Sequence, residues 1–590
     1  MMRKWRSRSA AFGVAAAMQA TSVFAAQPET PMLVFDVQAG KLPSVEERLP
    51  QQPRVINVAG MGREPGRHGG SMRFLMGDQR DIRMMTIYGY ARFVIFDEKG
   101  ELQPDILESY DVQDGRIFTL HLRRGHKWSD GQPFTTEDIR YYWEDVANNA
   151  RLSPGGPQQA YLAAGKPPKV EIIDATTIRF EWQEPNPAFL PALAGAQPLP
   201  LAMPAHYLKQ FHERYAKPDE LAAAVKQARF KDWGSLHERK SRHYRPENPE
   251  LPVLDPWRNL TNPPAEMFTF ERNPYFHRVD ENGRQLPYID RVLLSTGSTS
   301  LIPAKVGAGD ADLQARYLRF DNYTFLKHGE KQNGYKVKLW TRGEGAYVAI
   351  LPNLNAADLV WRALLRDVRF RRALSVGIDR QMINKAIFFG LGRESANTVL
   401  PQSPLYEPAL QRAWTQHDPD LANRLLDQIG LDKRDDDGVR LLPDGRRAEI
   451  TVDSSGEMSE ETDCLELIGH NWSKIGLKLL TRSAQRDVFR RRIAAGQTIM
   501  AVSQGMDNAV PSAEMEPIAL APSQYHQFQW PLWGQYMESR GREGEKPDVQ
   551  EAIELVDLLS RWKRSKSHSE REDVWRRMLE INADQVFTIG

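Results

Sequence analysis

The sequence is poor in cysteine and carries almost no net charge. Cys464 is the only cysteine among 590 residues, which excludes an internal disulfide, a cysteine-based zinc finger and an iron–sulfur cluster held by several thiolates. Lys and Arg total 78 against 77 Asp and Glu, so the formal net charge is +1. The chain therefore lacks the basic field that binding a nucleic-acid backbone requires, and we expect no nucleic-acid partner.

Catalytic motifs are also missing. The sequence contains no nucleophile elbow, zincin HExxH, Walker loop or dinucleotide-binding glycine pattern, and its 13 His include no i, i+4 pair. We therefore expect no enzyme activity, no cofactor and no metal. An exported hydrolase that uses a carboxylate pair is kept as an alternative, although the sequence selects no such pair.

One acidic segment has some features of a calcium loop. Residues 434–444 read RDDDGVRLLPD, with Asp437 and Gly438 in the order of such a loop. Lys433 stands where the first ligand belongs, and Asp444 stands where a bidentate Glu is expected. We therefore predict a hairpin turn at this segment.

The N-terminus has the pattern of a secretory signal peptide. Its first nine residues include 4 Lys or Arg, residues 10–25 are apolar with many small side chains, and residues 23–25 suit a signal peptidase. An uncleaved anchor is the alternative, but Gln19 and Thr21 interrupt the run, which is shorter than the ~20 residues of a membrane span. We predict a signal peptide at 1–25 and export. No Cys follows this cut, so lipid attachment there is excluded, and no later stretch approaches a transmembrane helix.

Strand and helix patterns alternate along the rest of the chain. Residues 71–76 and 117–122 are expected to be strands, and Thr135 is expected to cap a helix with Asp138 three residues on. Further helices are expected at about 368–390, 418–429, 459–475 and 548–582. Residues 212–265 are polar and rich in Pro, which predicts an extended surface insertion. The alternation predicts an α/β protein rather than a bundle or a sandwich.

Aromatic residues are abundant, with 14 Trp, 18 Tyr and 23 Phe. Trp530 and Trp533 lie in FQWPLWGQY, a segment that Pro531 and Gly534 interrupt too often for a regular helix. Two interpretations of these indoles are open. One is an aromatic loop beside a cavity, and the other is ordinary packing.

Three segments form recognisable motifs. Residues 120–138 read LHLRRGHKWSDGQPFTTED, residues 273–290 read NPYFHRVDENGRQLPYID, and residues 368–392 read VRFRRALSVGIDRQMINKAIFFGLG. These segments resemble signature regions of the bacterial extracellular solute-binding proteins of family 5, the oligopeptide- and dipeptide-type receptors of ABC importers. Weaker likeness between them covers most of residues 70–540. The motifs themselves consist of turns, caps and helix faces rather than ligand contacts.

The resemblance implies a two-lobed periplasmic binding protein of the large, type II-like α/β class, with a hinge and an extra domain. Mapped onto this chain, it predicts a discontinuous base lobe, an extra domain and a second lobe. The base lobe is expected at 27–87, 195–300 and 545–590, the extra domain at 88–194, and the second lobe at 301–544. In such receptors a ligand closes the lobes through contacts to both of them.

Family peptide receptors hold the ligand's ammonium with an aspartate in a loop of the second lobe. The matching loop here is SQGMDNAVPS, which makes Asp507, with Asn508 beside it, the expected ligand-binding position. A turn-capping Asp is the competing interpretation. The arginine that takes the carboxylate in dipeptide receptors has no counterpart, because the stretch at 453–463 reads DSSGEMSEETD.

These observations predict a monomeric periplasmic receptor that binds a peptide-like solute and delivers it to an ABC importer permease in the inner membrane. An oligosaccharide receptor of the same family is the alternative, with Trp530 and Trp533 as stacking platforms. Residues 584–590 begin an apolar strand and then stop, which is typical of a truncated chain.

Overall fold

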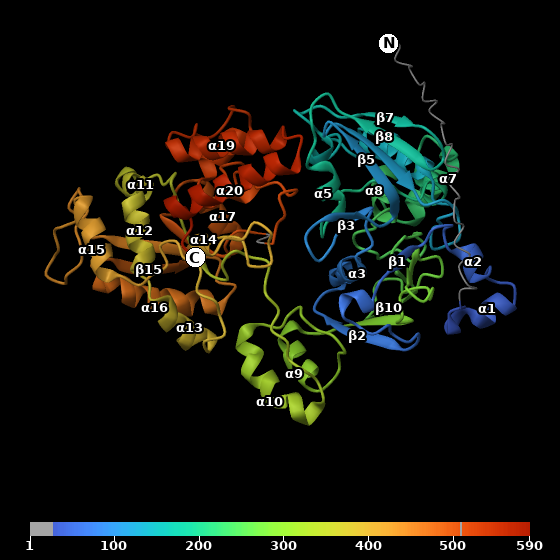
Figure 1. Ribbon diagram of the computed structural model, residues 1–590, viewed down its shortest axis with the longest axis horizontal. Coiled ribbons are helices and arrows are strands. Elements are labelled where there is room, and N and C mark those ends of the chain that lie inside the picture. The colour runs from blue at the N-terminus through green and yellow to red at the C-terminus, as the bar shows by residue number, and fades with distance from the viewer. Residues whose placement is uncertain (1–27, 508–509) are drawn as a thin grey trace, which may run out of the picture.

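The computed structural model describes residues 28–507 and 510–590, which form two halves lying side by side (Figure 1). The N-terminal half is drawn from blue to green and the C-terminal half from yellow to red. The chain passes from one to the other through residues 336–348. The predicted signal peptide at 1–25 and Asn508 lie outside the described residues. Within the described part, no helix is both long and apolar enough to cross a membrane.

The base of the first half is a four-stranded mixed sheet with the order β2-β12-β10-β9. β2 and β12 run parallel, and the other neighbours are antiparallel. β10 alternates exposed and buried residues, as a strand with one face on a core should. The strands are β2 (Ser71–Met76), β9 (Trp257–Asn259), β10 (Met267–Arg272) and β12 (Arg291–Thr296), and a parallel pair lies beside them, β1 (Arg54–Ile56) with β11 (Arg278–Asp280).

A second sheet, antiparallel throughout, forms the extra domain in the order β5-β6-β8-β7. Thr135 accepts a hydrogen bond at the start of α4 (Thr136–Arg140) and forms a capping box with Asp138, which confirms the predicted cap. The strands are β5 (Leu107–Gln113), β6 (Ile117–Leu122), β7 (Lys169–Ile172) and β8 (Thr177–Glu181), with the hairpin β3 (Val94–Phe96) and β4 (Leu102–Pro104) beside them. The other short helices up to residue 194 are α1 (Val34–Gln38), α2 (Val45–Arg48), α3 (Met84–Gly89) and α5 (Phe189–Ala194).

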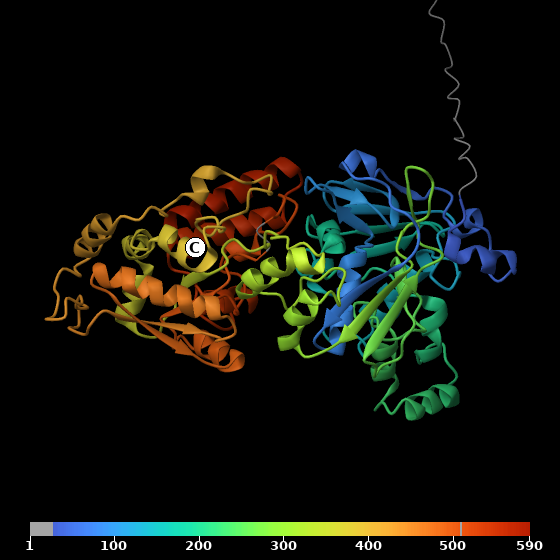
Figure 2. The ribbon, with the colours of Figure 1, turned by 90° about the horizontal axis from the view of Figure 1, so that it is seen from below.

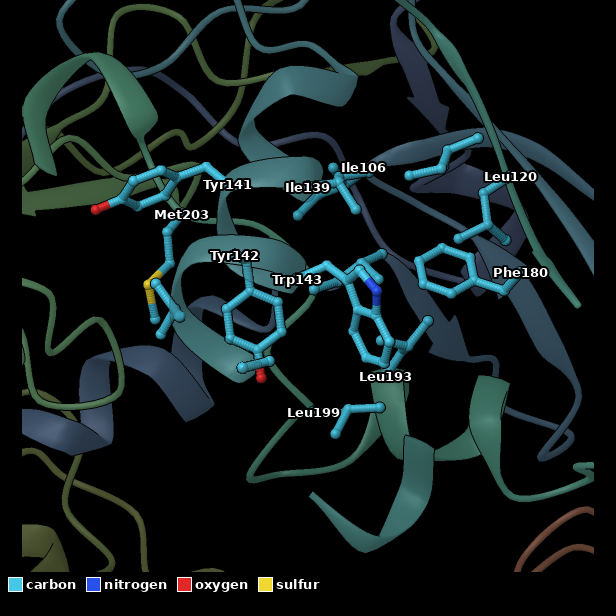
Figure 3. Close-up of a cluster of buried hydrophobic side chains, with 14 of the residues drawn as sticks. Ile106, Leu120, Ile139, Tyr141, Tyr142, Trp143, Phe180, Leu193, Leu199 and Met203 are labelled. Carbon is cyan, nitrogen blue, oxygen red and sulfur yellow. The ribbon is translucent and has the colours of Figure 1, made fainter. Parts of the chain in front are cut away.

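The segment after α5 packs on the extra domain, not on the base sheet. Figure 3 shows Leu199 and Met203 in one buried cluster with Phe180 of β8. The same core continues to Leu254. The prediction that 195–300 belongs wholly to the base lobe was therefore wrong for the residues from Leu199 to Leu254. The apolar residues of this segment complete the core of the extra domain instead.

Residues 212–265 hold two helices rather than an extended insertion throughout. α7 (Pro218–Gln227) starts with Pro at its first position and has two acids in its first turn, and α8 (Trp233–Lys240) is capped by Asp232. The short helix α6 (Ala205–Leu208) precedes them.

Residues 301–335 belong with the base sheet and not with the second lobe. They form α9 (Ile302–Gly307) and α10 (Tyr323–Asn333) below and between the halves (Figures 1 and 2). Asp312 pairs with Arg73 of β2 at 2.9 Å, and the Gln314 side chain bonds both backbone groups of Leu75. The predicted boundary at 301 was wrong because the chain after β12 returns to the edge strand β2.

The second half is built on a sheet with the order β13-β16-β14-β15, in which β14 runs parallel to both neighbours. The strands are β13 (Ala349–Pro352), β14 (Glu449–Ser454), β15 (Lys478–Ser483) and β16 (Met500–Ser503). The helices up to residue 494 are α11 (Leu359–Arg366), α12 (Val368–Val376), α13 (Arg380–Phe388), α14 (Pro408–Gln411), α15 (Pro419–Gln428), α16 (Ser459–Lys474) and α17 (Arg486–Ala494). Between α15 and β14, Asp435 bonds Val439 across a turn that contains Gly438 at φ +79°, which confirms the hairpin.

The C-terminal helices pack on the second half. α18 (Pro531–Glu538), α19 (Gln550–Lys563) and α20 (His568–Gln585) share a core with Leu405 and Met506, and Ile589 exchanges backbone hydrogen bonds with Ile350 of β13. The prediction that 545–590 belongs to the base lobe was therefore wrong. The apolar stripe predicted at 548–582 is real, but it covers the second half.

Candidate binding site between the two halves

A pocket of about 580 Å³ lies where the extra domain meets the C-terminal helices. The first half contributes the β3–β4 turn, Tyr110 of β5, Phe118 of β6 and Leu190 of α5. The second half contributes Leu405, residues 512–514 and the start of α20. The walls are mainly apolar, and they come from segments far apart in the sequence, so the pocket exists only when the two halves are together.

Charged groups of both signs surround the apolar walls. Glu514 accepts hydrogen bonds from His568 at 2.7 Å and from Arg571 at 2.9 Å. Burial raises the pKa of Tyr110, and the charge of Glu514 adds to the effect across the junction. The hydroxyl of Tyr110 donates to the carbonyl of Leu102 at 3.2 Å. A solute in this pocket would meet an apolar surface with cationic and anionic partners at its rim.

The wall at residues 512–514 is held in place by indoles of the C-terminal helices. Trp562 of α19 donates to the carbonyl of Ala513 at 2.9 Å, and Trp575 of α20 donates to that of Met515 at 2.7 Å. Both Trp residues are buried. The loop wall is therefore a rigid extension of the second half rather than a free turn.

Asp507 lies in the loop that leads to this wall. Before it, Gly505 donates to the carbonyl of Ala346, and Met506 donates to the side chain of Asn397. These bonds fasten the loop to the end of the inter-half connection. Asp507 itself is exposed and is not among the residues that line the pocket. The predicted neighbour Asn508 lies outside the described residues.

The two predicted aromatic contacts are core residues. Trp530 and Trp533 are both 0% exposed, and Trp533 lies inside helix α18, where a loop had been predicted. The Trp530 ring lies 5.2 Å from that of Phe587. Pro531 fits because it occupies the first helical position, where no backbone donor is needed. Of the two interpretations, ordinary packing describes these indoles, and neither offers a ring face to a ligand.

Sequence reasoning missed the residues that form the pocket. Phe118 was predicted only as part of the strand at 117–122, and Tyr110, Glu514 and Arg571 were not singled out. Nothing in their local patterns marks them, because the pocket is made by contact between halves. The sequence offered one signal for this site, which is that Glu514 lies close in the sequence to the loop of Asp507.

Comparison with known proteins gives a consistent result. Residues 101–523 match the family described as bacterial extracellular solute-binding proteins, family 5 Middle. The chain is 26% identical to the periplasmic alpha-galactoside-binding protein of Rhizobium meliloti, over 94% of this chain and 80% of that protein.

Solved structures agree with the family match. An oligopeptide-binding protein OppA is 31% identical over 96% of this chain and 90% of its own, with a TM-score of 0.81. The binding protein MelB of Agrobacterium fabrum, solved with stachyose, shares the fold, with a TM-score of 0.63 and 22% identity over 95% of this chain and 84% of its own. The relatives thus include proteins named for peptides and proteins named for oligosaccharides.

Proposed function

The chain belongs to the bacterial extracellular solute-binding proteins, family 5, and we propose that it captures a peptide-like solute between its two halves and delivers it to the permease of an ABC importer. The family and the relatives are transport-binding proteins. Capture by closure of two halves is a shift between conformations and needs no covalent step. We therefore propose a receptor without catalytic activity.

The pocket between the halves is the observation that carries this proposal. Its apolar walls suit a hydrophobic side chain, and the mixed charges of Glu514, Arg571 and Lys566 at its rim suit a solute with both an ammonium and a carboxylate. Because both halves supply walls, a bound solute would stabilise the closed arrangement over a separated one. The 31% identity to an OppA over 96% of the chain supports the peptide-like class.

The same relatives support a proposed location and partner. The relatives are periplasmic proteins, and the signal-peptide pattern at 1–25 supports export to the periplasm without lipid attachment. We propose that the receptor works as a monomer and docks on an inner-membrane permease.

An oligosaccharide ligand is the second candidate. The observation that favours it is the likeness to an alpha-galactoside-binding protein over 94% of the chain. The buried positions of Trp530 and Trp533 weigh against it, since both indoles were its expected stacking platforms. No Trp is among the pocket-lining residues that the structure describes.

Native mass spectrometry of the protein purified from an exporting bacterial host tests the proposal directly. A set of co-purified peptides, released on mild denaturation, supports the peptide-like class. A discrete sugar mass, or a mass shift with added stachyose and none with tri- and tetrapeptides, moves the assignment to the oligosaccharide candidate. Turnover of chromogenic esters, glycosides or peptides at enzyme-like rates would contradict both.

Calorimetric titration then locates the site. Removing the ring of Tyr110 by Tyr110→Ala takes away one wall, and we expect affinity for the identified solute to fall about tenfold, or ~1.4 kcal/mol. Tyr525→Ala is the matched control, because Tyr525 is 55% exposed and does not line the pocket. Equal affinities of the two variants would place the ligand elsewhere.

A further inference from the structure

Two buried histidines meet at the junction between the extra domain and the base of the first half. His126 comes from the loop that follows β6, and His277 lies just before β11. They are 1% and 0% exposed, and their ring centroids lie 4.9 Å apart at an angle of 49°. The two imidazoles therefore make a direct contact between the two units of this half.

Neither imidazole has all of its hydrogen-bonding groups satisfied. Nε2 of His277 lies 2.9 Å from Asp105, but Nδ1 of His277 and Nδ1 of His126 have no hydrogen-bond partner among the described residues. The His126 ring packs edge-on against Phe134 of the extra-domain core, at 5.5 Å and 81°. In the charged form both nitrogens of a histidine ring carry hydrogen, so each ring would then hold a buried Nδ1–H donor without an acceptor.

The charged groups around this pair are mostly cationic. Arg278 pairs with Asp105 at 2.6 Å, and Arg54 pairs with it at 3.2 Å. Nε of Arg123 donates to the backbone carbonyl of Asp105 at 2.9 Å. The next titratable groups around these side chains are Tyr90, Arg92, Glu108 and Asp255. A protonated imidazole would therefore join three guanidinium groups that share one carboxylate, which is an unfavourable place for a further cation.

Burial and these neighbours favour the neutral form of both rings. Burial lowers the pKa of His277 to about 4, although Asp105 opposes the shift. Burial also holds the pKa of His126 well below its usual range, and the charges of His277 and Arg123 add to the effect. If the extra domain separated from the base, rings in water would regain the ordinary histidine pKa of about 6.5. The separated arrangement binds protons more tightly, so acid favours it.

We propose that His126 and His277 form an acid-operated latch, which holds the extra domain on the base sheet while both imidazoles are neutral and releases it when they are protonated. Below about pH 6.5, each histidine shifts the equilibrium toward release about tenfold for every pH unit, because release takes up one proton per ring. For His277 this effect continues down to about pH 4.

Release of the extra domain also affects the binding pocket between the two halves. The extra domain supplies Tyr110 and Phe118 to that pocket, so the released arrangement lacks these walls. Acid should therefore weaken solute capture. This consequence rests on the proposed function, whereas the latch itself does not.

Hydrogen–deuterium exchange mass spectrometry between about pH 7 and about pH 5 tests the latch without any ligand. The backbone N–H of Gln51, just before β1, donates to the carbonyl of Arg124 at 2.9 Å and so bridges the junction. After correction for the intrinsic pH dependence of exchange, we expect opening at this amide to increase about a hundredfold from pH 6 to pH 5, tenfold for each histidine. Residues 359–376 are the internal control and should not lose protection, because the second half contains no buried histidine among its described residues.

His126→Phe is the decisive variant. A phenyl ring keeps the contact with Phe134 and cannot be protonated, and the change removes no hydrogen bond at Nδ1. We expect the increase in opening to fall from about a hundredfold to about tenfold per pH unit, because only His277 still titrates. His121→Phe is the matched control, since His121 lies on β6 with its side chain 34% exposed and pairs with Asp111 at the surface. This control should keep the full hundredfold increase.

Two results would overturn the latch. One is opening at Gln51 that does not depend on pH, and the other is the same pH dependence in His126→Phe as in the wild type. If His126→Phe does not fold, His277→Gln gives the same test from the base side of the junction. Its amide can still donate to Asp105 but does not titrate, so the same fall to about tenfold per pH unit is expected. An unchanged hundredfold increase in His277→Gln would overturn the latch as well.

Discussion

Nε2 of His277 lies 2.9 Å from Oδ1 of Asp105, and both side chains are 0% exposed. Asp105 follows β4 in the extra domain, whereas His277 precedes β11 beside the base sheet. The same carboxylate pairs with Arg278 at 2.6 Å and with Arg54 at 3.2 Å. This one buried group therefore holds the extra domain on the base of the first half.

Asp105 and His277 differ in their ionisation at neutral pH. Burial alone would raise the pKa of Asp105, but Arg278 and His277 hold it well below its usual range. Burial lowers the pKa of His277 to about 4 despite the opposing pull of Asp105. At neutral pH the cluster is thus a carboxylate with two guanidinium partners and a neutral imidazole that donates a hydrogen bond.

Asp105→Asn should destabilise the protein strongly, because it leaves two guanidinium groups near a buried site without their carboxylate. We expect a loss of about 3–5 kcal/mol in the free energy of unfolding, measured by denaturant titration. Asp111→Asn is the control, since that carboxylate is 69% exposed in its pair with His121. Its expected effect is within ~0.5 kcal/mol. Similar unfolding curves for the two variants would mean that the cluster does not hold the domains together.

Local structure was predictable from the sequence, and the assembly of local units was not. The strands at Ser71–Met76 and Ile117–Leu122 have the predicted bounds, and the Thr135 cap is present. These features depend on alternation and on side chains within a few residues. The predicted helix at 368–390 is two helices, because the chain turns after Val376 and Asp379 caps a new one.

The predicted domain boundaries were wrong for a physical reason. The apolar stripe of α19 and α20 shows that these helices bury one face, but it does not name the surface that they cover. The same holds for Leu199 and Met203. The pocket residues were missed in the same way, since Tyr110 and Glu514 become neighbours only after the halves meet.

Trp533 should behave as a core residue. Trp533→Ala is expected to cost about 3–5 kcal/mol of stability, because a buried indole leaves a large cavity. The matched change Trp340→Ala removes an indole that is 63% exposed and should shift stability by less than ~0.5 kcal/mol. Thermal unfolding of both variants checks the pair. A Trp533→Ala protein of normal stability with altered ligand affinity would restore the aromatic-platform interpretation.

Glu461 should make stability depend on pH. Its pKa is raised from 4.5 to about 7 in the folded chain, so the folded state binds the extra proton more tightly than the unfolded state. The stability of the protein should therefore fall as pH rises from about 4.5 to about 7 through this group, by up to ~3 kcal/mol. Glu461→Gln should remove that loss, giving a gain in unfolding free energy at pH 8 and none at pH 4. Glu466→Gln, exposed on the same helix, is the control, and an equal gain at both pH values in Glu461→Gln would contradict the assignment.

Asp507 is the predicted partner of a cationic group on the captured solute. If closure of the halves buries its carboxylate against an ammonium, Asp507→Ala should weaken binding by about 2–5 kcal/mol. Asp507→Asn should lose less, because it keeps the shape and one acceptor oxygen. Titration with a peptide and with its N-acetylated form, which lacks the ammonium, isolates the charge contribution. The acetylated peptide should bind wild type and Asp507→Ala alike, and an unchanged dissociation constant of the free peptide in Asp507→Ala would remove Asp507 from the site.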